Sequence, residues 1–177
     1  GRPCPVLIDF PKYVQTALRE PRPTMHLVDE REPLCHTAIS EARTLIAAAR
    51  KPVLYVGGGV ALADAVDELR AFAAETAMPA VTTLKGIGSL DPQSAGYMGM
   101  LGMHGTKAAN LAVQESDLLL VVGARFDDRV TGRLNAFAPH AKVIHLDVDA
   151  AEIGKRRSVQ VSLQADLKEV LPLLAMP

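Results

Sequence analysis

Composition excludes several functional classes. The 177 residues suffice for one domain with a sizeable core, or for one domain with an extended arm. With 19 basic and 20 acidic residues the net charge is −1, so electrostatic attraction favours neither nucleic acid nor an anionic membrane. Aromatic residues make up 4% and tryptophan is absent, which argues against a base-stacking surface.

Cysteine use and hydropathy indicate a reduced, cytoplasmic setting. Cys4 and Cys35 form neither a CxxC pair nor a Cys/His ligand pattern, so we expect no disulfide framework and no metal site. No signal-peptide pattern occurs, and no apolar run approaches the ~18 residues that a membrane span needs. The chain begins at Gly1, in what reads as the middle of an element, so we expect it to be a piece of a longer protein.

An extended arm is expected at the start of the chain. Val6, Leu7 and Ile8 form a short apolar run behind two prolines, which predicts a buried strand. Residues 11–33 then mix charges with four prolines and have no stable periodicity, which indicates a linker.

Helices and strands alternate over the rest of the chain. Apolar residues at three- and four-residue steps predict a helix over 36–50. Further along we expect strands at 52–56, 80–83, 117–122, 142–146 and 159–163, and helices at 61–76, 103–115, 129–136 and 167–174, with a loop leading to residue 103. This alternation predicts parallel pairing with right-handed crossovers, that is, a doubly wound, Rossmann-like α/β sheet.

Four polar turns follow the predicted strands. They comprise residues 57–59, 83–86, 123–129 and 147–149. In an open parallel sheet the ligand lies beyond the carboxyl ends of the strands. We therefore expect these turns to gather along one edge of the sheet and to share a ligand.

The turn at 57–59 lies between a strand and a helix, as in a dinucleotide fingerprint. Leu62 stands where the third glycine belongs, and the next strand ends without the acidic residue that binds the adenosine ribose. The usual mode of NAD binding is therefore the least favoured alternative. No glycine-lysine-serine or glycine-lysine-threonine sequence occurs, which excludes a P-loop enzyme.

A glycine-rich stretch, MGMLGMHGTKAAN, occupies residues 98–110. It is either a loose surface turn or a loop whose amides cradle a phosphate or carboxylate, with Thr106 or His104 as the cap of the helix that follows. Its methionines fit core packing or contact with a flat cofactor. His104 and His140 have no partnered serine or cysteine nearby, so a catalytic triad has no basis.

Two further sets of charged residues have alternative interpretations. Arg125 and Arg129 stand beside the two aspartates of GARFDDRVTG, which fits either internal ion pairs or recognition of an anion. Asp147 and Asp149 close the strand VIHLDVD, where they could accept hydrogen bonds from ribose or ribityl hydroxyls. For Asp149 the alternative is a helix N-cap.

Several motifs together resemble one enzyme family. The chain contains, in order, GRPCPVLIDFPKYVQ, KPVLYVGGG, TLKGIGSLDP, YMGMLGMHGTKAAN, GARFDDRVTG and HLDVDAAEI. Over essentially its whole length it resembles the central domain of the large subunit of acetohydroxyacid synthase, also called acetolactate synthase. The resemblance implies an enzyme that decarboxylates pyruvate and condenses it with a second 2-oxo acid, using thiamine diphosphate and magnesium. It also implies that this middle domain binds FAD, whose redox chemistry the main reaction does not need.

The resemblance implies FAD contacts at particular positions. These are Gly57, Gly58, Gly59, Thr83, Leu84 and Lys85 near the diphosphate and ribitol, Leu101, Gly102, Met103 and His104 near the flavin, Gly123, Arg125, Arg129 and Val130 in the second turn, and Asp147, Val148, Asp166 and Leu167 beside the adenosine half. It further implies that Met103 and Arg129 face the active-site channel, where Arg129 suits the carboxylate of the second oxo acid.

The sequence departs from the family pattern at four positions. Cys4 replaces a glycine, Tyr13 an aspartate, Ala150 a proline, and Ala165 a glycine that precedes Asp166. The added methyl group of Ala165 is expected to crowd the approach of the cofactor to the backbone.

The family's thiamine-activating glutamate and its GDG…N motif belong to neighbouring domains, and GDG occurs nowhere in this chain. We therefore expect residues 1–35 to be a trailing strand and linker of the preceding domain, and residues 36–177 to be a central FAD-binding domain that does not make acetolactate alone. Implied partners are the neighbouring domains, a second copy of the subunit, 2-oxo acids and a candidate regulatory small subunit. The alternative is a structural spacer whose nucleotide site is empty.

Overall fold

One parallel sheet organises the molecule. The structure is a computed structural model that describes residues 5–18, 20 and 33–175. In this part of the chain six strands pair in the order β3-β2-β1-β4-β5-β6, all parallel. The strands are β1 Pro52–Val56, β2 Ala80–Thr82, β3 Tyr97–Met100, β4 Leu118–Val122, β5 Lys142–Asp147 and β6 Val161–Gln164. The predicted doubly wound α/β fold is confirmed, and its switch point lies between β1 and β4.

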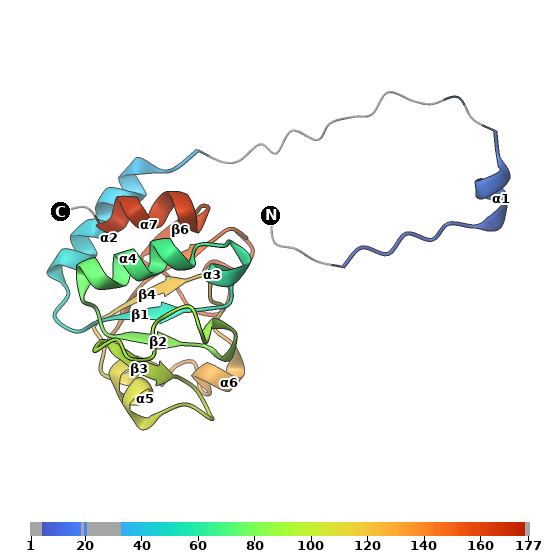
Figure 1. Ribbon diagram of the computed structural model, residues 1–177. Coiled ribbons are helices and arrows are strands. Elements are labelled where there is room, and N and C mark those ends of the chain that lie inside the picture. The colour runs from blue at the N-terminus through green and yellow to red at the C-terminus, as the bar shows by residue number, and fades with distance from the viewer. Residues whose placement is uncertain (1–4, 19, 21–32, 176–177) are drawn as a thin grey trace.

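Helices cover both faces of the sheet (Figure 1). The helices are α1 Lys12–Thr16, α2 His36–Ala48, α3 Gly59–Leu62, α4 Val66–Thr76, α5 Lys107–Gln114, α6 Asp128–Thr131 and α7 Leu167–Ala175, with a 3-10 turn, η1, at Leu84–Gly86. One apolar cluster joins one face of the sheet to α2, α4 and α7, and a second joins the other face to α5 and the segment after β4. No helix in the described part of the chain is long and apolar enough to cross a membrane.

The central strands form because their residues are apolar on both faces. All five residues of β4 are buried, as the uninterrupted run LLLVV predicts. Alternation along each strand sends Tyr55, Val121 and His145, which pair in register across β1, β4 and β5, to the same face. Two of these three side chains are polar, yet none is exposed to solvent.

The structure corrects three predicted boundaries. Residues 97–100, predicted as loop, form the edge strand β3, which is half-buried and joins β2 with a shift in register. The predicted helix 61–76 is divided into α3 and α4 because Asp64 adopts φ 54°. The helix predicted from residue 103 begins only at Lys107.

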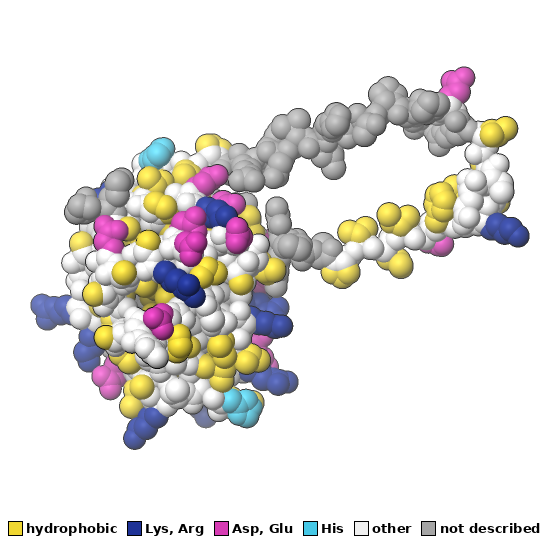
Figure 2. Space-filling view, viewed as in Figure 1, with side chains coloured by type: hydrophobic (Ala, Val, Ile, Leu, Met, Phe, Trp, Pro, Cys, Tyr) yellow, Lys and Arg dark blue, Asp and Glu magenta, His cyan; other side chains and the backbone are white. Residues whose placement is uncertain are grey.

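The segment before residue 20 differs most from expectation. Val6, Leu7 and Ile8 are not in a strand and are 80%, 94% and 78% exposed. Figure 1 and Figure 2 show this stretch extending away from the sheet, with its apolar side chains uncovered. A strand needs a neighbour to pair with, and no strand among the described residues pairs with this stretch, so the predicted buried strand is wrong for the part of the chain that the structure describes. The predicted linker contains the short helix α1, and much of it lies outside the described residues.

Candidate functional site

The turns that were expected to share an edge do so. The first residues beyond the strands are Gly57 after β1, Thr83 after β2, Leu101 after β3, Gly123 after β4 and Val148 after β5. Since these strands are parallel and paired in register, their carboxyl ends face the same way. Figure 1 shows α3 and α6 at this edge.

The turns after β1 and β4 touch backbone to backbone at the switch point. The Gly57 N–H donates to the Val122 carbonyl over 2.9 Å, and the Gly59 N–H to the Gly123 carbonyl over 2.8 Å. A Cβ atom added to Gly59 would lie 2.7 Å from the Gly123 Cα, and Gly123 has φ 55°. These glycines are therefore required by contact between the turns themselves, before any ligand is considered.

The glycine-rich stretch 98–110 is an ordered loop and not a loose turn. Thr106 caps α5: its hydroxyl accepts a hydrogen bond from the Ala109 N–H at 3.0 Å and donates one to the Met98 carbonyl at 2.6 Å. The Asn110 side chain accepts from the Gly102 N–H and donates to the Gly102 carbonyl, at 2.9 and 3.1 Å. Thr106 is thus the cap, and His104 is not.

The same loop contacts the turn that carries Arg129. The Met103 N–H donates to the Arg129 carbonyl over 3.0 Å. Gly102, at φ 101°, allows this approach, because a Cβ there would lie 2.9 Å from the Arg129 oxygen. The Met103 side chain is 66% exposed, and Val130 packs into the core beneath. The structure therefore brings Met103 and Arg129 together on the surface of the carboxyl edge.

Residues 123–127, here called the Arg125 turn, alternate between buried and exposed side chains. Ala124 and Phe126 are buried, whereas the Arg125 side chain is 60% exposed. Arg125 Nη2 lies 3.4 Å from Asp127 Oδ2. A hydrogen bond from the Arg129 N–H, with smaller contributions from the Asp128 side chain and the two arginines, lowers the pKa of Asp127. The internal ion pair considered from sequence is therefore present at Arg125, but it is solvent-exposed and weak.

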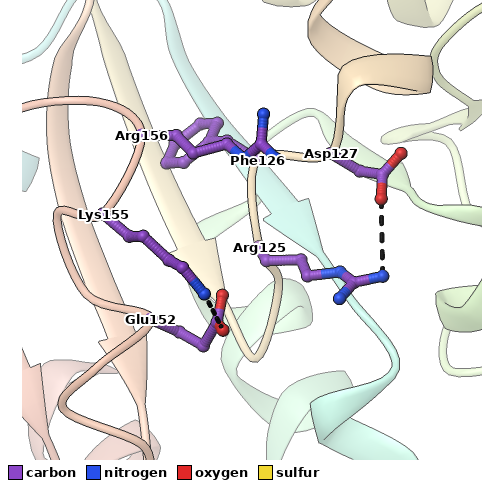
Figure 3. A pocket seen from close by; sticks show the side chains of 6 residues that line it. All are labelled: Arg125, Phe126, Asp127, Glu152, Lys155 and Arg156. Carbon is purple, nitrogen blue, oxygen red and sulfur yellow. Dashed lines mark hydrogen bonds and ion pairs between the residues drawn. The ribbon is translucent and has the colours of Figure 1, made fainter.

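A shallow hollow lies between the Arg125 turn and the β5–β6 connection (Figure 3). Its volume is about 220 Å³, and its lining residues are Arg125, Phe126, Asp127, Glu152, Lys155 and Arg156. Lys155 pairs with Glu152 at 2.7 Å. Three cations and two carboxylates therefore face this space, with one aromatic ring at its base.

The match to a family of known proteins decides the chain's identity. Residues 39–174 match the family described as thiamine pyrophosphate enzyme, central domain. The chain belongs to this family. All six strands, the helix α4, the candidate edge and all but the last residue of α7 lie within the matched residues.

Relatives of this central domain carry one recurrent description. The chain is 56% identical to the acetolactate synthase isozyme 2 large subunit of Escherichia coli (strain K12), over 100% of the chain and 32% of the relative. It is 52% identical to the acetolactate synthase large subunit of Corynebacterium glutamicum, over 98% and 28%, and 44% identical to acetolactate synthase 1, chloroplastic, of Zea mays, over 97% and 27%. The chain spans less than a third of the length of each of these relatives.

On the β5 and β6 side of the central domain, the expected site residues divide into exposed and buried. Asp147 Oδ1 accepts from the Asp149 N–H at 2.9 Å, and Val148 is 45% exposed. Asp166 caps α7 by accepting from the Lys168 N–H at 3.0 Å. Leu167 is only 4% exposed and lies in the core, so its side chain does not reach the edge.

Two alternatives on this side are resolved by the backbone. Asp149 accepts from the Ala151 N–H at 3.0 Å, but residues 150–157 form turns, so it begins no α-helix. The Ala165 methyl group packs against the core. The expected crowding of a cofactor by Ala165 stays a prediction.

On the β1 and β2 side the turns again pack together. The Thr83 hydroxyl accepts from the Gly86 N–H at 3.2 Å and begins η1, which leaves Leu84 and Lys85 exposed. Gly58 faces this turn, because an added Cβ would lie 2.7 Å from the Lys85 Cβ. These residues and the Gly57–Gly123 contact together form a continuous rim.

Sequence reasoning missed the residues beneath the rim. The His145 ring nitrogen Nε2 lies 2.9 Å from the Ala124 carbonyl, and the Tyr55 hydroxyl lies 3.4 Å from the Arg125 carbonyl. Lys155 and Arg156, which line the hollow, were also not predicted. A signal for the first pair was available, since each is a polar residue inside an otherwise apolar strand run.

Proposed function

We propose that this chain is the FAD-binding central domain of an acetolactate synthase large subunit. The observation that carries the proposal is the carboxyl edge of the sheet, where the glycine turns, Met103, Arg125 and Arg129 gather. Its support is twofold: open parallel sheets bind nucleotides at this edge, and the relatives are acetolactate synthases along the whole chain.

The residues present fit an anionic dinucleotide. Gly57, Gly59 and Gly123 let the turns after β1 and β4 pack backbone to backbone, so that the switch point presents backbone and not side chains of these residues to a ligand. Arg129 has no ion pair among the described residues, and the Arg125 pair with Asp127 is exposed enough to be exchanged for a diphosphate oxygen. The hollow of about 220 Å³ is too small for a whole dinucleotide and suits one part of it.

In this proposal each part of the edge has one task. The rim from Gly57 to Lys85 and Arg125 would hold the diphosphate and ribitol, the loop 101–104 would lie along the flavin ring, and Asp147 would accept from ribose hydroxyls. FAD, when bound, supplies a ring that can take up two electrons. The chain's own residues bind, orient and cover that ring.

The activity of the whole enzyme belongs to the proposal as well. The parent would decarboxylate pyruvate and join it to a second 2-oxo acid, with thiamine diphosphate and magnesium held by domains outside this chain. Met103 and Arg129 would border the channel, and Arg129 would pair with the carboxylate of the second substrate. We further propose a cytoplasmic, homo-oligomeric enzyme in which residues 1–35 join this domain to the preceding one, and to which a regulatory small subunit binds.

A spacer domain with no nucleotide is the competing function. The glycine contacts favour it in part, since they are needed for packing alone. The exposed Arg125 and Arg129 on the same edge favour the cofactor, because packing of the turns does not require two cations there and Arg125 is paired only through an exposed contact with Asp127.

Thermal shift and fluorescence titration with FAD and NAD distinguish these functions. We expect FAD to raise the melting temperature of the chain and its fluorescence to fall on binding, whereas NAD should have no comparable effect. Arg125→Ala should weaken FAD binding about tenfold. Lys142→Ala, an exposed change at the opposite end of β5, is the matched control. If the unmutated 177-residue chain responds equally to FAD and NAD, or does not respond to millimolar FAD, the cofactor role is rejected.

A further inference from the structure

Two buried side chains support the Arg125 turn from beneath. The Tyr55 hydroxyl reaches the Arg125 carbonyl at 3.4 Å, and His145 Nε2 lies 2.9 Å from the Ala124 carbonyl. Neither Tyr55 nor His145 is exposed to solvent. They come from β1 and β5, the strands that flank β4, so two consecutive carbonyls of one turn are held by side chains from different strands.

The protonation states of both groups follow from these contacts. A carbonyl oxygen only accepts, so His145 must carry its proton on Nε2. Burial lowers the pKa of His145, which keeps the ring neutral. Burial also raises the pKa of Tyr55 well above its ordinary value, so the phenol stays protonated. Both side chains are therefore hydrogen-bond donors at neutral pH.

Phe126 links the two donors. Its ring meets Tyr55 and His145 edge to face, with centroids 5.7 Å apart in both cases. These ring contacts hold Phe126, the residue after Arg125, in place. The two carbonyl contacts hold the backbone at Ala124 and Arg125. The Arg125 side chain is left with the outward direction, where it lines the hollow (Figure 3).

Core filling alone does not account for His145. Its Nδ1 is buried and has no hydrogen-bond partner among the described residues. An apolar side chain would fill the same space without an unsatisfied nitrogen, and buried unpaired polar atoms are costly. The Nε2 contact with the turn is thus the property that distinguishes histidine here.

We propose that Tyr55 and His145 are positioning residues, which hold the carbonyls of the Arg125 turn so that the Arg125 guanidinium faces a bound anion. The anion is the diphosphate of a dinucleotide, so this inference rests on the proposed function. Neither residue touches the ligand; both act through Arg125.

The first test needs no ligand. His145→Met removes the donor and keeps the volume, whereas His145→Gln keeps an N–H donor. We expect His145→Met to raise the pKa of Asp127 toward its ordinary value, because the turn would shift and move Asp127 relative to the Arg129 N–H, Arg125 and Asp128. We expect His145→Gln to retain the lowered pKa. Carbon-detected NMR titration of the Asp127 carboxyl measures this, and ¹⁵N shifts of the His145 ring should report the Nε2–H tautomer.

The second test is a double-mutant cycle on FAD affinity. We expect His145→Met to weaken FAD binding about tenfold, Tyr55→Phe about threefold, and neither to weaken it further when Arg125→Ala is already present. Tyr97→Phe is the matched control, since it removes a hydroxyl that bonds Thr82 Oγ1 at 2.9 Å on the far strand pair. Additive losses in the Arg125→Ala background would overturn the proposal.

The outcomes separate the two claims. If the unmutated chain binds no FAD while His145→Met shifts the Asp127 titration as expected, the FAD function fails and the role of His145 in positioning the turn stands. An unchanged Asp127 titration in folded His145→Met overturns the positioning role. If that variant does not fold, Tyr55→Phe decides: behaviour equal to Tyr97→Phe in both measurements overturns the role as well.

Discussion

At the scale of single residues, Gly57 has no room for a side chain. A Cβ there would lie 2.2 Å from the Gly123 oxygen and 2.4 Å from the Ala124 Cβ. We expect Gly57→Ala to lower the free energy of unfolding by about 1–3 kcal/mol, as overpacking does. Denaturant unfolding measures it, with Gly96→Ala as control, because the nearest atom to its Cβ would be 3.1 Å away. Equal effects of the two changes would contradict the backbone contact described at the switch point.

Asp117, just before β4, forms a pH-dependent contact with the connection between α2 and β1. Its carboxylate accepts from the Arg50 and Lys51 N–H groups at 2.8 and 2.9 Å. Burial alone would raise the pKa of Asp117, but these hydrogen bonds outweigh it, and the pKa is lowered. A lowered pKa stabilises the fold fully above the unfolded value of about 3.9, and this stabilisation is lost as pH falls through the lower folded value.

Asp117→Asn isolates this contribution. The single oxygen of an asparagine amide can replace only one of the two carboxylate oxygens that accept from the Arg50 and Lys51 N–H groups, so we expect a loss of about 1 kcal/mol at pH 7. The difference from the unmutated chain should shrink as the pH falls below about 4, because the Asp117 carboxyl of the unfolded chain is protonated first and that of the folded chain only at a lower pH. Unfolding curves at several pH values measure it. A difference that stays constant down to pH 2 would show that the charge of Asp117 has no role.

At the scale of elements, the helix α5 depends on its cap. Thr106 closes the helix and also bonds the Met98 carbonyl, so it ties α5 to β3. We expect Thr106→Ala to cost about 1 kcal/mol and to speed amide exchange in α5, while Thr106→Ser retains most of the protection. Hydrogen exchange of the α5 amides measures the difference between the alanine and serine variants. Unaltered exchange in the alanine variant would mean that the loop, and not the cap, fixes the helix.

Arg157 holds the segment between α6 and β5 in place. Its guanidinium donates to the carbonyls of Phe137, Ala138 and Ala141, the last two at 2.7 and 2.9 Å. We expect Arg157→Lys to lose about 2 kcal/mol and to speed amide exchange over residues 136–142, because one ammonium group cannot reproduce the planar fork. Arg156→Lys is the control, because the Arg156 side chain forms no hydrogen bond or ion pair with a described residue. Similar exchange in both variants would contradict this role.

Which elements were predictable depends on how local their signals are. β4 and α2 follow from their own apolar patterns, and Thr106 was readable as a cap from its position before a helical run. β3 was missed because it is short, half-buried and glycine-containing, and is defined mainly by pairing with β2. The contact of His145 with Ala124 was not readable, since it depends on chain segments brought together by the sheet. The convergence of Met103 and Arg129 was expected from the family resemblance and not from their local patterns.

At the scale of the whole molecule, the sheet is covered by helices, whereas the candidate site and the segment before residue 20 expose apolar side chains to solvent. The rim carries exposed Leu84, Met103 and Val148, and the arm carries exposed Val6, Leu7 and Ile8. Such surfaces match a chain that spans less than a third of its relatives. Under the proposed function, this chain binds the cofactor, and the carbon–carbon bond forms only in an assembly with neighbouring domains.

A crystal structure of the 177-residue chain grown with saturating FAD tests this central claim most directly. The account predicts a dinucleotide lying across the Gly57–Gly123 contact, with the Arg125 guanidinium within hydrogen-bond distance of a diphosphate oxygen and the flavin along residues 101–104. Flavin density elsewhere on the molecule, or an edge without flavin at full saturation, would contradict it.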